Sequence, residues 1–369
     1  MKRWLTCAAG LWLVPASWAP AQDVTFQKEK PFRFELDALA RGEWTRDIFV
    51  TGTSTTNDDR RRLQARPALE AHFGPVRLGV GAELNYSSDK NYETSTGAAP
   101  ALIRDNYKSR DARVDLAFAE YESSWVHVQG GRFEMPVGLT EMIWDKDLRP
   151  QGGAVSLGVK DRGALKRAAI TGLWARGSHV FDDGDATMSL VSGNVVFRTG
   201  ETGSVELVGS YIDFSDFQGM QAGIRRQNTR VGGQLVLDYD VLDFVARFRR
   251  GGAIPVQLVA EYGWNTAVDA NNHGLWLAGV LGSLQSGVGA RLDYTYAKVD
   301  KDTTLAAYGA DDFFWVTGWR GHRGELGFKL LRRLSVHAVA HFVQFKDSPR
   351  PEERDHWLKR YRAELRFKY

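Results

Sequence analysis

Hydrophobic and polar residues alternate in many separate segments of this chain. In residues 76–86, every second position is apolar, and these positions are Val76, Leu78, Val80, Ala82, Leu84 and Tyr86. The positions between them are Arg77, Gly79, Gly81, Glu83 and Asn85. Because successive side chains of a strand point to opposite faces, this segment predicts a strand with one apolar and one polar face. The same pattern recurs in residues 32–44, 254–264, 288–296, 334–342 and 361–369.

Two features favour a transmembrane barrel over a soluble sandwich, whose strands also alternate. The segments approach the about 9–11 residues of a tilted transmembrane strand, whereas soluble strands have about 5–6. Aromatic residues also gather at segment ends, as girdles at two membrane interfaces would require; they are Trp44, Phe73, Tyr86, Tyr262, Trp264, Tyr294, Tyr296 and Tyr369. The sequence therefore predicts an all-β fold, a transmembrane antiparallel β-barrel. Tyr369 at the end of an amphipathic strand resembles the signal read by the barrel assembly machinery, which is an expected partner.

The connections between these segments alternate between short and long. Bacterial barrels have short periplasmic turns and long external loops. The short connections are residues 74–75, 123–124, 199–203, 250–253, 284–286 and 331–333, and the long ones are 45–60, 87–111, 136–154, 215–232 and 298–320. One assignment keeps this alternation and places both termini in the periplasm. It has sixteen strands: 32–44, 61–73, 76–86, 112–122, 125–135, 155–160, 165–176, 186–198, 204–214, 233–248, 254–264, 274–283, 287–297, 322–330, 334–345 and 357–369. The weakest strand is 155–160, and a smaller barrel with misread turns is the alternative.

Residues 1–21 have the features of a secretory signal peptide. Lys2 and Arg3 precede an apolar run at residues 4–14, and small residues follow at 19–21. The apolar run is too short to cross about 30 Å of hydrocarbon as a helix. We therefore expect export to the bacterial outer membrane, a short periplasmic segment at residues 22–31, and a barrel from residue 32 to residue 369.

Composition and charge exclude several other classes of protein. The chain has 48 Lys and Arg against 45 Asp and Glu, without the concentrated basic excess of a nucleic-acid-binding protein. The only cysteine, Cys7, lies in the expected signal, so neither a disulfide scaffold nor a thiolate metal site is expected in the exported chain. No apolar run of about 18 residues follows the signal, which excludes helical membrane spans. No cofactor is expected. The acidic runs 57–59 and 182–185 could ligate calcium, but they match no full calcium-binding loop, and solvated turns are favoured.

A barrel of about 16–18 strands encloses an aqueous channel, whereas side chains fill a barrel of about eight. Charged residues on the polar faces must point into that channel, because a lysine or arginine facing lipid costs about 2–4 kcal/mol at mid-bilayer. The candidates for the channel lining on the strands are Arg33, Asp37, Arg66, Glu83, Arg113, Arg291, Arg362 and Glu364. For most of them taken singly, a salt bridge between neighbouring strands is the favoured interpretation.

The connection 136–154 differs from an ordinary external loop. Its core contains the apolar residues Met142, Ile143 and Trp144 among several charges, and the preceding Gly130 and Gly131 could let the chain bend. We expect it to fold into the barrel, with Met142, Ile143 and Trp144 packed on the wall. The candidates for a constriction that sets ion preference are Glu141, Asp145, Asp147 and Arg149. The alternative is an external cap without effect on permeation.

Residues 131–139, Gly-Arg-Phe-Glu-Met-Pro-Val-Gly-Leu, and residues 143–152, Ile-Trp-Asp-Lys-Asp-Leu-Arg-Pro-Gln-Gly, carry a resemblance to a known family. They resemble the putative porin family of Gram-negative outer membranes, which is related to the phosphate-selective porins O and P. The resemblance implies a sixteen-stranded pore, commonly a homotrimer, whose third external loop narrows the channel. Phosphate-selective relatives use arginine ladders and a lysine cluster inside the pore. In this chain the arginines are accompanied by acids and inward lysines are few, which argues against phosphate selectivity.

The predicted function is passive diffusion of small hydrophilic solutes or ions across the outer membrane, among its lipid and lipopolysaccharide. The excess of inward arginines inclines the prediction toward anions. One alternative is a lipase-type or protease-type barrel enzyme, but no serine lies in a nucleophile-elbow sequence and no HExxH spacing occurs. Another is a closed structural or adhesive barrel, although the loops lack repeats and Ser/Thr tracts.

Overall fold

The computed structural model describes residues 31–51, 54–88, 111–176, 186–217, 228–285, 289–309, 313, 317–346, 354 and 356–369. The expected signal peptide, nearly all of the segment 22–31 and the acidic run 182–185 lie outside the described residues. No described helix is long and apolar enough to cross a membrane.

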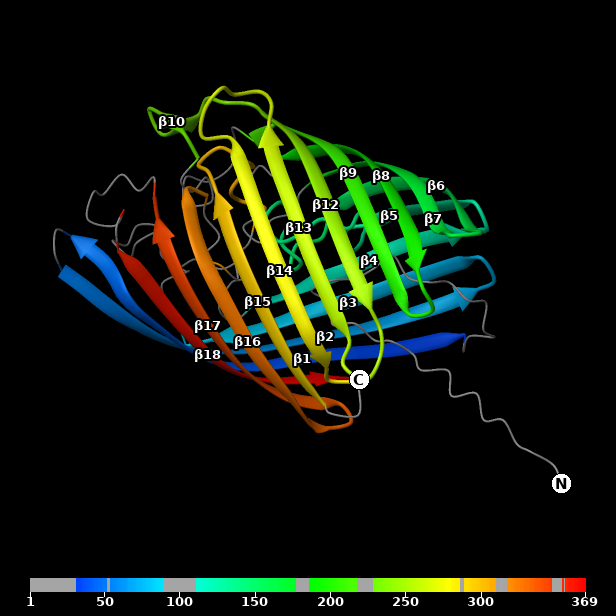
Figure 1. The fold of residues 1–369 in the computed structure, drawn as a ribbon, viewed down its shortest axis with the longest axis horizontal. Coiled ribbons are helices and arrows are strands. Elements are labelled where there is room, and N and C mark those ends of the chain that lie inside the picture. The colour runs from blue at the N-terminus through cyan, green and yellow to red at the C-terminus, as the bar shows by residue number, and fades with distance from the viewer. Residues whose placement is uncertain are drawn as a thin grey trace.

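Sixteen strands form one closed antiparallel barrel (Figure 1). They are β1 (Phe32–Thr51), β2 (Ser54–Phe73), β3 (Val76–Ser87), β4 (Asp111–Glu122), β5 (Val126–Arg132), β6 (Gln151–Arg162), β7 (Leu165–Arg176), β8 (Thr187–Thr199), β9 (Gly203–Ser215), β12 (Tyr239–Arg250), β13 (Val256–Asn265), β14 (His273–Ser283), β15 (Ala290–Val299), β16 (Trp319–Leu331), β17 (Leu334–Phe345) and β18 (Trp357–Lys368). The short strands β10 (Arg230–Val231) and β11 (Gln234–Leu235) form a separate hairpin. The predicted strand count is confirmed, and the weakest predicted strand, 155–160, is the twelve-residue β6.

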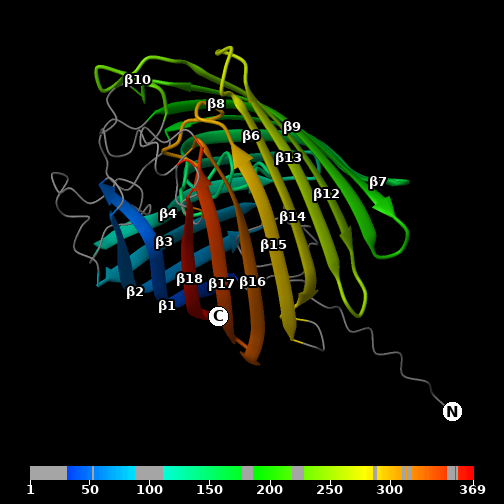
Figure 2. The same cartoon turned by 60° about the vertical axis from the view of Figure 1, so that its left-hand side comes forward.

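The barrel closes where β1 pairs with β18, so the sheet has no unpaired edge. Figure 2 shows this seam, with the red β18 beside the blue β1. Arg41 of β1 lies opposite Glu364 of β18 on one side and Arg62 of β2 on the other. The inner faces of strands from the two ends of the chain therefore form one continuous charged wall.

The outer face of the barrel is apolar. On β6 the side chains of Val155, Leu157 and Val159 are exposed, whereas those of Ala154 and Ser156 are buried. On β7, Ile170 is 64% exposed and Trp174 is 62% exposed. Apolar side chains outside and charged ones inside are the arrangement of a barrel in lipid. The predicted transmembrane barrel is therefore confirmed.

The interior has an apolar half that the sequence analysis did not predict. Inward residues near the external ends of β7 to β9 and β12 to β15 pack into a hydrophobic core, which includes Leu173, Leu190, Ile212, Val241, Val259, Trp276 and Val299. Residues 302–308, which follow β15, are buried against this core. The prediction that 298–320 is wholly an external loop is therefore wrong for this part. The reason is the apolar run Leu305-Ala306-Ala307-Tyr308, which needs a partner surface.

The predicted long connection 45–60 is wrong for most of its length, since β1 runs to Thr51 and β2 begins at Ser54. Other predicted boundaries also differ from the structure. β5 ends at Arg132 and β6 begins at Gln151, so the loop between them is 133–150 rather than 136–154. Gly152 and Gly153 have no side chains to show alternation, which hid the start of β6 in the sequence. The predicted strand 233–248 begins only at Tyr239, because residues 230–235 form the β10–β11 hairpin.

Candidate functional site in the barrel interior

Two glycines allow the chain to leave β5 and re-enter the sheet at β6. Gly131 has φ +111°, and a Cβ atom there would lie 2.2 Å from the carbonyl oxygen of Ala117. A Cβ atom on Gly152 would lie 2.2 Å from the carbonyl oxygen of Trp174. Both contacts are with backbone, which cannot move aside without distorting the sheet. The predicted bend at Gly131 is confirmed.

Gly131→Ala should therefore destabilise the barrel around the loop, because the alanine would be strained at this φ and would collide with β4. Backbone strain of this kind costs about 1–3 kcal/mol. We expect the variant to unfold at a lower temperature in detergent when strand content is followed by circular dichroism. Gly172→Ala on the outer face of β7 is the control, since no atom lies within 4 Å of its added Cβ. Equal unfolding temperatures for the two variants would contradict the assignment.

The loop 133–150 folds into the barrel through apolar contacts. Met142, Ile143 and Trp144 are at most 4% exposed. The Met142 side chain lies beside Gly263 of β13 and Gly274 of β14, where a Cβ atom would collide with it. The Trp144 ring stacks on the Tyr308 ring of the other buried segment, with 5.4 Å between centroids. The expected inward fold of this loop, with its apolar residues on the wall, is confirmed.

Hydrogen bonds hold the same loop on the apolar half. The Thr140 amide donates to Glu261 of β13 at 3.2 Å, and its hydroxyl group contacts the same carboxylate. The Arg247 guanidinium of β12 donates to the carbonyl oxygen of Gly138. The Asp145 amide donates to the carbonyl oxygen of Tyr308 at 2.7 Å, while the Asp145 carboxylate accepts the amide of Asp147 at 2.8 Å. Asp145 is 2% exposed, so its role in the structure is to stabilise the conformation of the loop.

The opposite edge of the loop reaches the charged half. Asp147 forms an ion pair with Arg66 of β2 at 2.8 Å, and Arg149 forms one with Asp115 of β4 at 3.3 Å. Burial alone would raise the pKa of Asp147, but the charges of Arg66, Lys146 and Arg62 together outweigh burial and lower it below its ordinary value. Asp147 therefore stays ionised at neutral pH, and the loop is tied across the interior from β13 to β2.

Four of the predicted site residues meet in one cluster, which we call the Glu83 cluster: Arg66, Glu83, Arg113 and Asp147. Glu83 of β3 is 0% exposed and accepts from Arg113 at 2.6 Å, and its distance to Arg66 is 3.3 Å. Gln64 and Asn85 also donate to Glu83, at 2.6 and 2.7 Å. The Asp147 carboxylate of the loop therefore faces a part of the wall where two arginines both contact Glu83.

A second group, the Glu43 cluster, contains residues that the sequence analysis missed. Glu43 of β1 contacts Arg60 of β2 and, from β18, Arg360 at 3.4 Å and the predicted Arg362 at 2.6 Å. The run Arg60-Arg61-Arg62 hid the alternation at the start of β2. Counting backward by twos from Arg66 would have placed Arg60 and Arg62 on the inner face.

Two further groups belong to the charged half. The predicted Glu364 bonds Arg41 at 2.7 Å and Arg366 at 2.5 Å. In the Glu325 cluster, Glu325 of β16 accepts from Arg323 at 2.6 Å, Arg366 at 2.8 Å and His337 at 2.8 Å. The loop residue Glu141 pairs with Lys146 at 2.9 Å and lies 4.0 Å from Arg323.

Three predicted residues lie apart from these clusters, near the end with the short turns. Arg33 pairs with Glu35 at 2.5 Å, and Asp37 lies 3.6 Å from Lys368. Arg291 pairs with its own strand neighbour Asp293 at 2.5 Å. Their role in the channel lining stays a prediction. Among the described residues, no group of three or more His, Cys, Asp and Glu is arranged to hold a metal ion.

No protein-family model matches the sequence, and no curated protein sequence matches it. Solved structures share its fold. The high-pH structure of Pseudomonas putida OprB has a TM-score of 0.58 and 12% identity, covering 92% of this chain and 94% of that one. Salmonella typhi OmpF, solved in complex with daunomycin, has a TM-score of 0.54 and 13% identity, covering 92% and 97%. The anion-selective porin from Comamonas acidovorans has a TM-score of 0.51 and 12% identity, covering 92% and 100%. At these identities the likeness concerns the fold, and the chain has the transmembrane barrel fold of Gram-negative porins.

Proposed function

We propose that the chain is a passive diffusion channel of the Gram-negative outer membrane for small hydrophilic solutes, with a preference for anions. The observation that carries this proposal is the charged inner wall of a closed sixteen-stranded barrel. Its fold is that of porins, one of which is described as anion-selective. Membership of the putative porin family and kinship with the phosphate-selective porins O and P belong to the same proposal.

The solute path runs along the charged half of the interior. The loop 133–150 and the buried residues 302–308 occupy the apolar half, where they pack on β8, β9 and β12 to β14. The path passes the ion pair of Asp147 with Arg66, where the loop meets the wall. The candidate constriction residues Glu141, Asp147 and Arg149 all lie on this edge of the loop. Asp145 is buried behind this edge and stabilises the conformation of the loop.

The preference for anions follows from the balance of charges on the wall. Around Glu43 there are three arginines within 4 Å of one carboxylate. The Glu325 cluster places two arginines on one strand glutamate, whereas in the Glu83 cluster Glu83 and Asp147 balance two arginines. Charged rings that line a pore set its ion selectivity, and an excess of guanidinium groups favours anions.

Recordings from the purified protein in planar lipid bilayers test the function. We expect discrete conductance steps and, under a potassium chloride gradient, a reversal potential whose sign indicates chloride preference. Heat-denatured protein in the same detergent is the control. Absence of conductance from folded protein would contradict the channel, and a cation-selective reversal potential would contradict only the anion preference.

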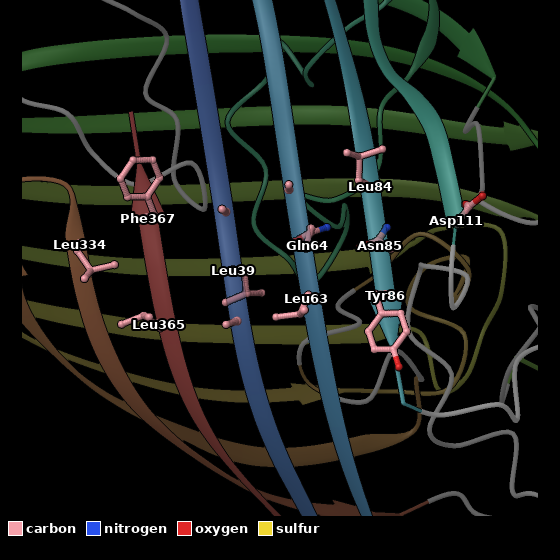
Figure 3. A pocket seen from close by; sticks show the side chains of 13 residues that line it. Leu39, Leu63, Gln64, Leu84, Asn85, Tyr86, Asp111, Leu334, Leu365 and Phe367 are labelled. Atoms are coloured by element: carbon pink, nitrogen blue, oxygen red, sulfur yellow. The ribbon is translucent and has the colours of Figure 1, made fainter.

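We further propose that the channel is a homotrimer that associates through its outer wall at the barrel seam. A depression of about 420 Å³ lies there, floored by Ala38 and Ala40 of β1 and Ala65 of β2. Figure 3 shows Leu365 and Phe367 of β18 on one side of it, and Leu84 and Tyr86 of β3 on the other. Small residues allow the backbones of neighbouring membrane proteins to approach closely. Assembly in the outer membrane would use the final strand, with Tyr369, as its recognition signal.

Ala40→Trp should therefore reduce the trimer to monomers, because the indole would fill the depression. Native mass spectrometry in detergent measures the subunit number directly. Gly172→Trp, on the outer face of β7, is the matched control and should leave the trimer intact. A monomeric wild type, or a trimer that tolerates Ala40→Trp, would contradict this interface.

A further inference from the structure

Three side chains on the inner wall form a hydrogen-bonded series at the end of the barrel with the short turns. Ser335 and His337 are two residues apart on β17, so both face inward, while Val336 between them is exposed on the outer wall. The Ser335 hydroxyl oxygen lies 2.8 Å from Nε2 of His337, and Nδ1 of His337 lies 2.8 Å from Oε1 of Glu325 on β16. A nucleophile, a base and a carboxylate that orients the base are therefore connected in the order found in serine hydrolases.

The surroundings of His337 fix both its ring and its tautomer. His337 lies opposite Gly327 of β16, where a Cβ atom would be 2.9 Å from the imidazole ring, so the ring occupies the space that a side chain would fill. Glu325 forms ion pairs with Arg323 at 2.6 Å and Arg366 at 2.8 Å, as a carboxylate does. A carboxylate only accepts hydrogen bonds, so Nδ1 of His337 carries the proton and Nε2 can accept a proton from the serine hydroxyl.

Ser335 is accessible from the lumen and has a cation on either side. Its side chain is partly exposed, whereas those of His337 and Glu325 are at most 5% exposed. Ser335 lies directly opposite Lys329 of β16 and Arg366 of β18. Residues directly opposite each other have Cβ atoms about 4.5–5.5 Å apart, so both cations can reach a group bound to the serine. Lys329 is exposed and has no ion pair with any described residue, whereas Arg366 is held by two glutamates.

We propose that Ser335, His337 and Glu325 form an esterase site for carboxylic esters that carry an anionic group. The Ser335 oxygen attacks the ester carbonyl carbon while its proton passes to Nε2 of His337. His337 then gives this proton to the alcohol oxygen as the bond from that oxygen to the carbonyl carbon breaks, which leaves the acyl group on Ser335. Water attacks the acyl carbon and gives one proton to His337, which returns it to the Ser335 oxygen as the carboxylic acid leaves.

The neighbouring groups have separate parts in this reaction. The Arg366 guanidinium, fixed by its carboxylate partners, stabilises the negative oxygen of the tetrahedral intermediate. The Lys329 ammonium group binds the anionic group of the substrate. Glu325 is a positioning residue, because it acts through His337. The reaction requires neither ion conduction nor a preference for anions, so the esterase and the proposed channel can each fail without the other.

Labelling of the purified, folded protein with a fluorophosphonate tests the nucleophile. Such reagents react with a serine that a neighbouring base activates. We expect intact-protein mass spectrometry to show one added phosphonyl group on wild type and none on Ser335→Ala. Ser204→Ala is the matched control and should be labelled like wild type, because Ser204 is an inward serine of β9, opposite Arg249, whose side chain bonds no described residue. An unlabelled wild type, or equal labelling of Ser335→Ala, would overturn the proposal.

Hydrolysis of 4-nitrophenyl acetate and of anionic 4-nitrophenyl hemisuccinate tests the other groups. We expect His337→Gln to lower kcat by about 10²–10⁴, the usual contribution of a general base. Glu325→Gln should lower kcat and leave KM unchanged, as expected of a positioning residue. Lys329→Gln should raise KM about tenfold for the hemisuccinate and leave KM for the acetate unchanged, because only the hemisuccinate has a charge to bind. Wild-type kcat in His337→Gln would overturn the esterase, and an unchanged KM of Lys329→Gln for the hemisuccinate would overturn the assigned substrate class.

Discussion

The double variant Arg360→Gln/Arg362→Gln should lose most of the preference for anions. It leaves Glu43 with Arg60 as its nearest basic partner and turns a positive region of the wall into a neutral one. Fields of this kind raise local concentrations of an oppositely charged solute by about 10–10³. We expect the chloride-to-potassium permeability ratio, taken from reversal potentials at low salt, to fall by about tenfold.

Two controls separate charge from structure in that experiment. Arg360→Lys/Arg362→Lys keeps both charges and should keep the preference for anions. Arg320→Gln/Lys359→Gln removes two charges from the outer wall and should not change the permeability ratio. The effect should also shrink in about 1 M salt, where the screening length is about 3 Å. A permeability ratio that is the same for glutamine, lysine and wild-type proteins would contradict the assigned path.

Trp144→Ala should release the loop 133–150 from the apolar half. The substitution removes the ring that stacks on Tyr308, which itself stacks on Phe214 of β9 at 5.7 Å. Truncating a buried tryptophan costs about 3–5 kcal/mol, so the two buried segments would separate. We expect a larger and noisier single-channel conductance, because the loop can then move within the lumen.

The control for this variant is Trp174→Ala on β7, whose side chain is 62% exposed on the outer wall. It should leave the conductance unchanged. A Trp144→Ala channel with the conductance and noise of wild type would show that the loop does not limit permeation. The loop would then act only as packing for the apolar half.

The architecture could be predicted from the sequence because the strands of a membrane barrel alternate between apolar outward residues and polar inward residues. Every barrel strand was predicted, including β6, which was kept only to preserve the alternation of turns and loops. The inward loop was predicted from Met142, Ile143 and Trp144, since apolar residues in a polar connection need a surface to pack on. The same reasoning applied to Leu305 and Tyr308 would have found the second buried segment.

The partners of the charged residues could not be predicted in the same way. Alternation gives the face on which Arg362 lies, but the partner of Arg362 is Glu43, 319 positions away along the chain. That pairing depends on the register between β1 and β18, which local patterns do not encode. The division of the lumen into a charged half and an apolar half could not be predicted for a related reason. Inward apolar residues such as Leu190 and Ile212 have the same sequence pattern as residues of any buried strand.

Cysteine substitution at inward positions of the two halves tests the central claim most directly. The only native cysteine, Cys7, would be replaced by serine, and single cysteines placed at Gln64 on the charged half and at Leu190 on the apolar half. With an anionic thiol reagent added during bilayer recording, the Gln64→Cys channel should be blocked and the Leu190→Cys channel should not. Block through Leu190→Cys with no block through Gln64→Cys would contradict a path along the charged wall.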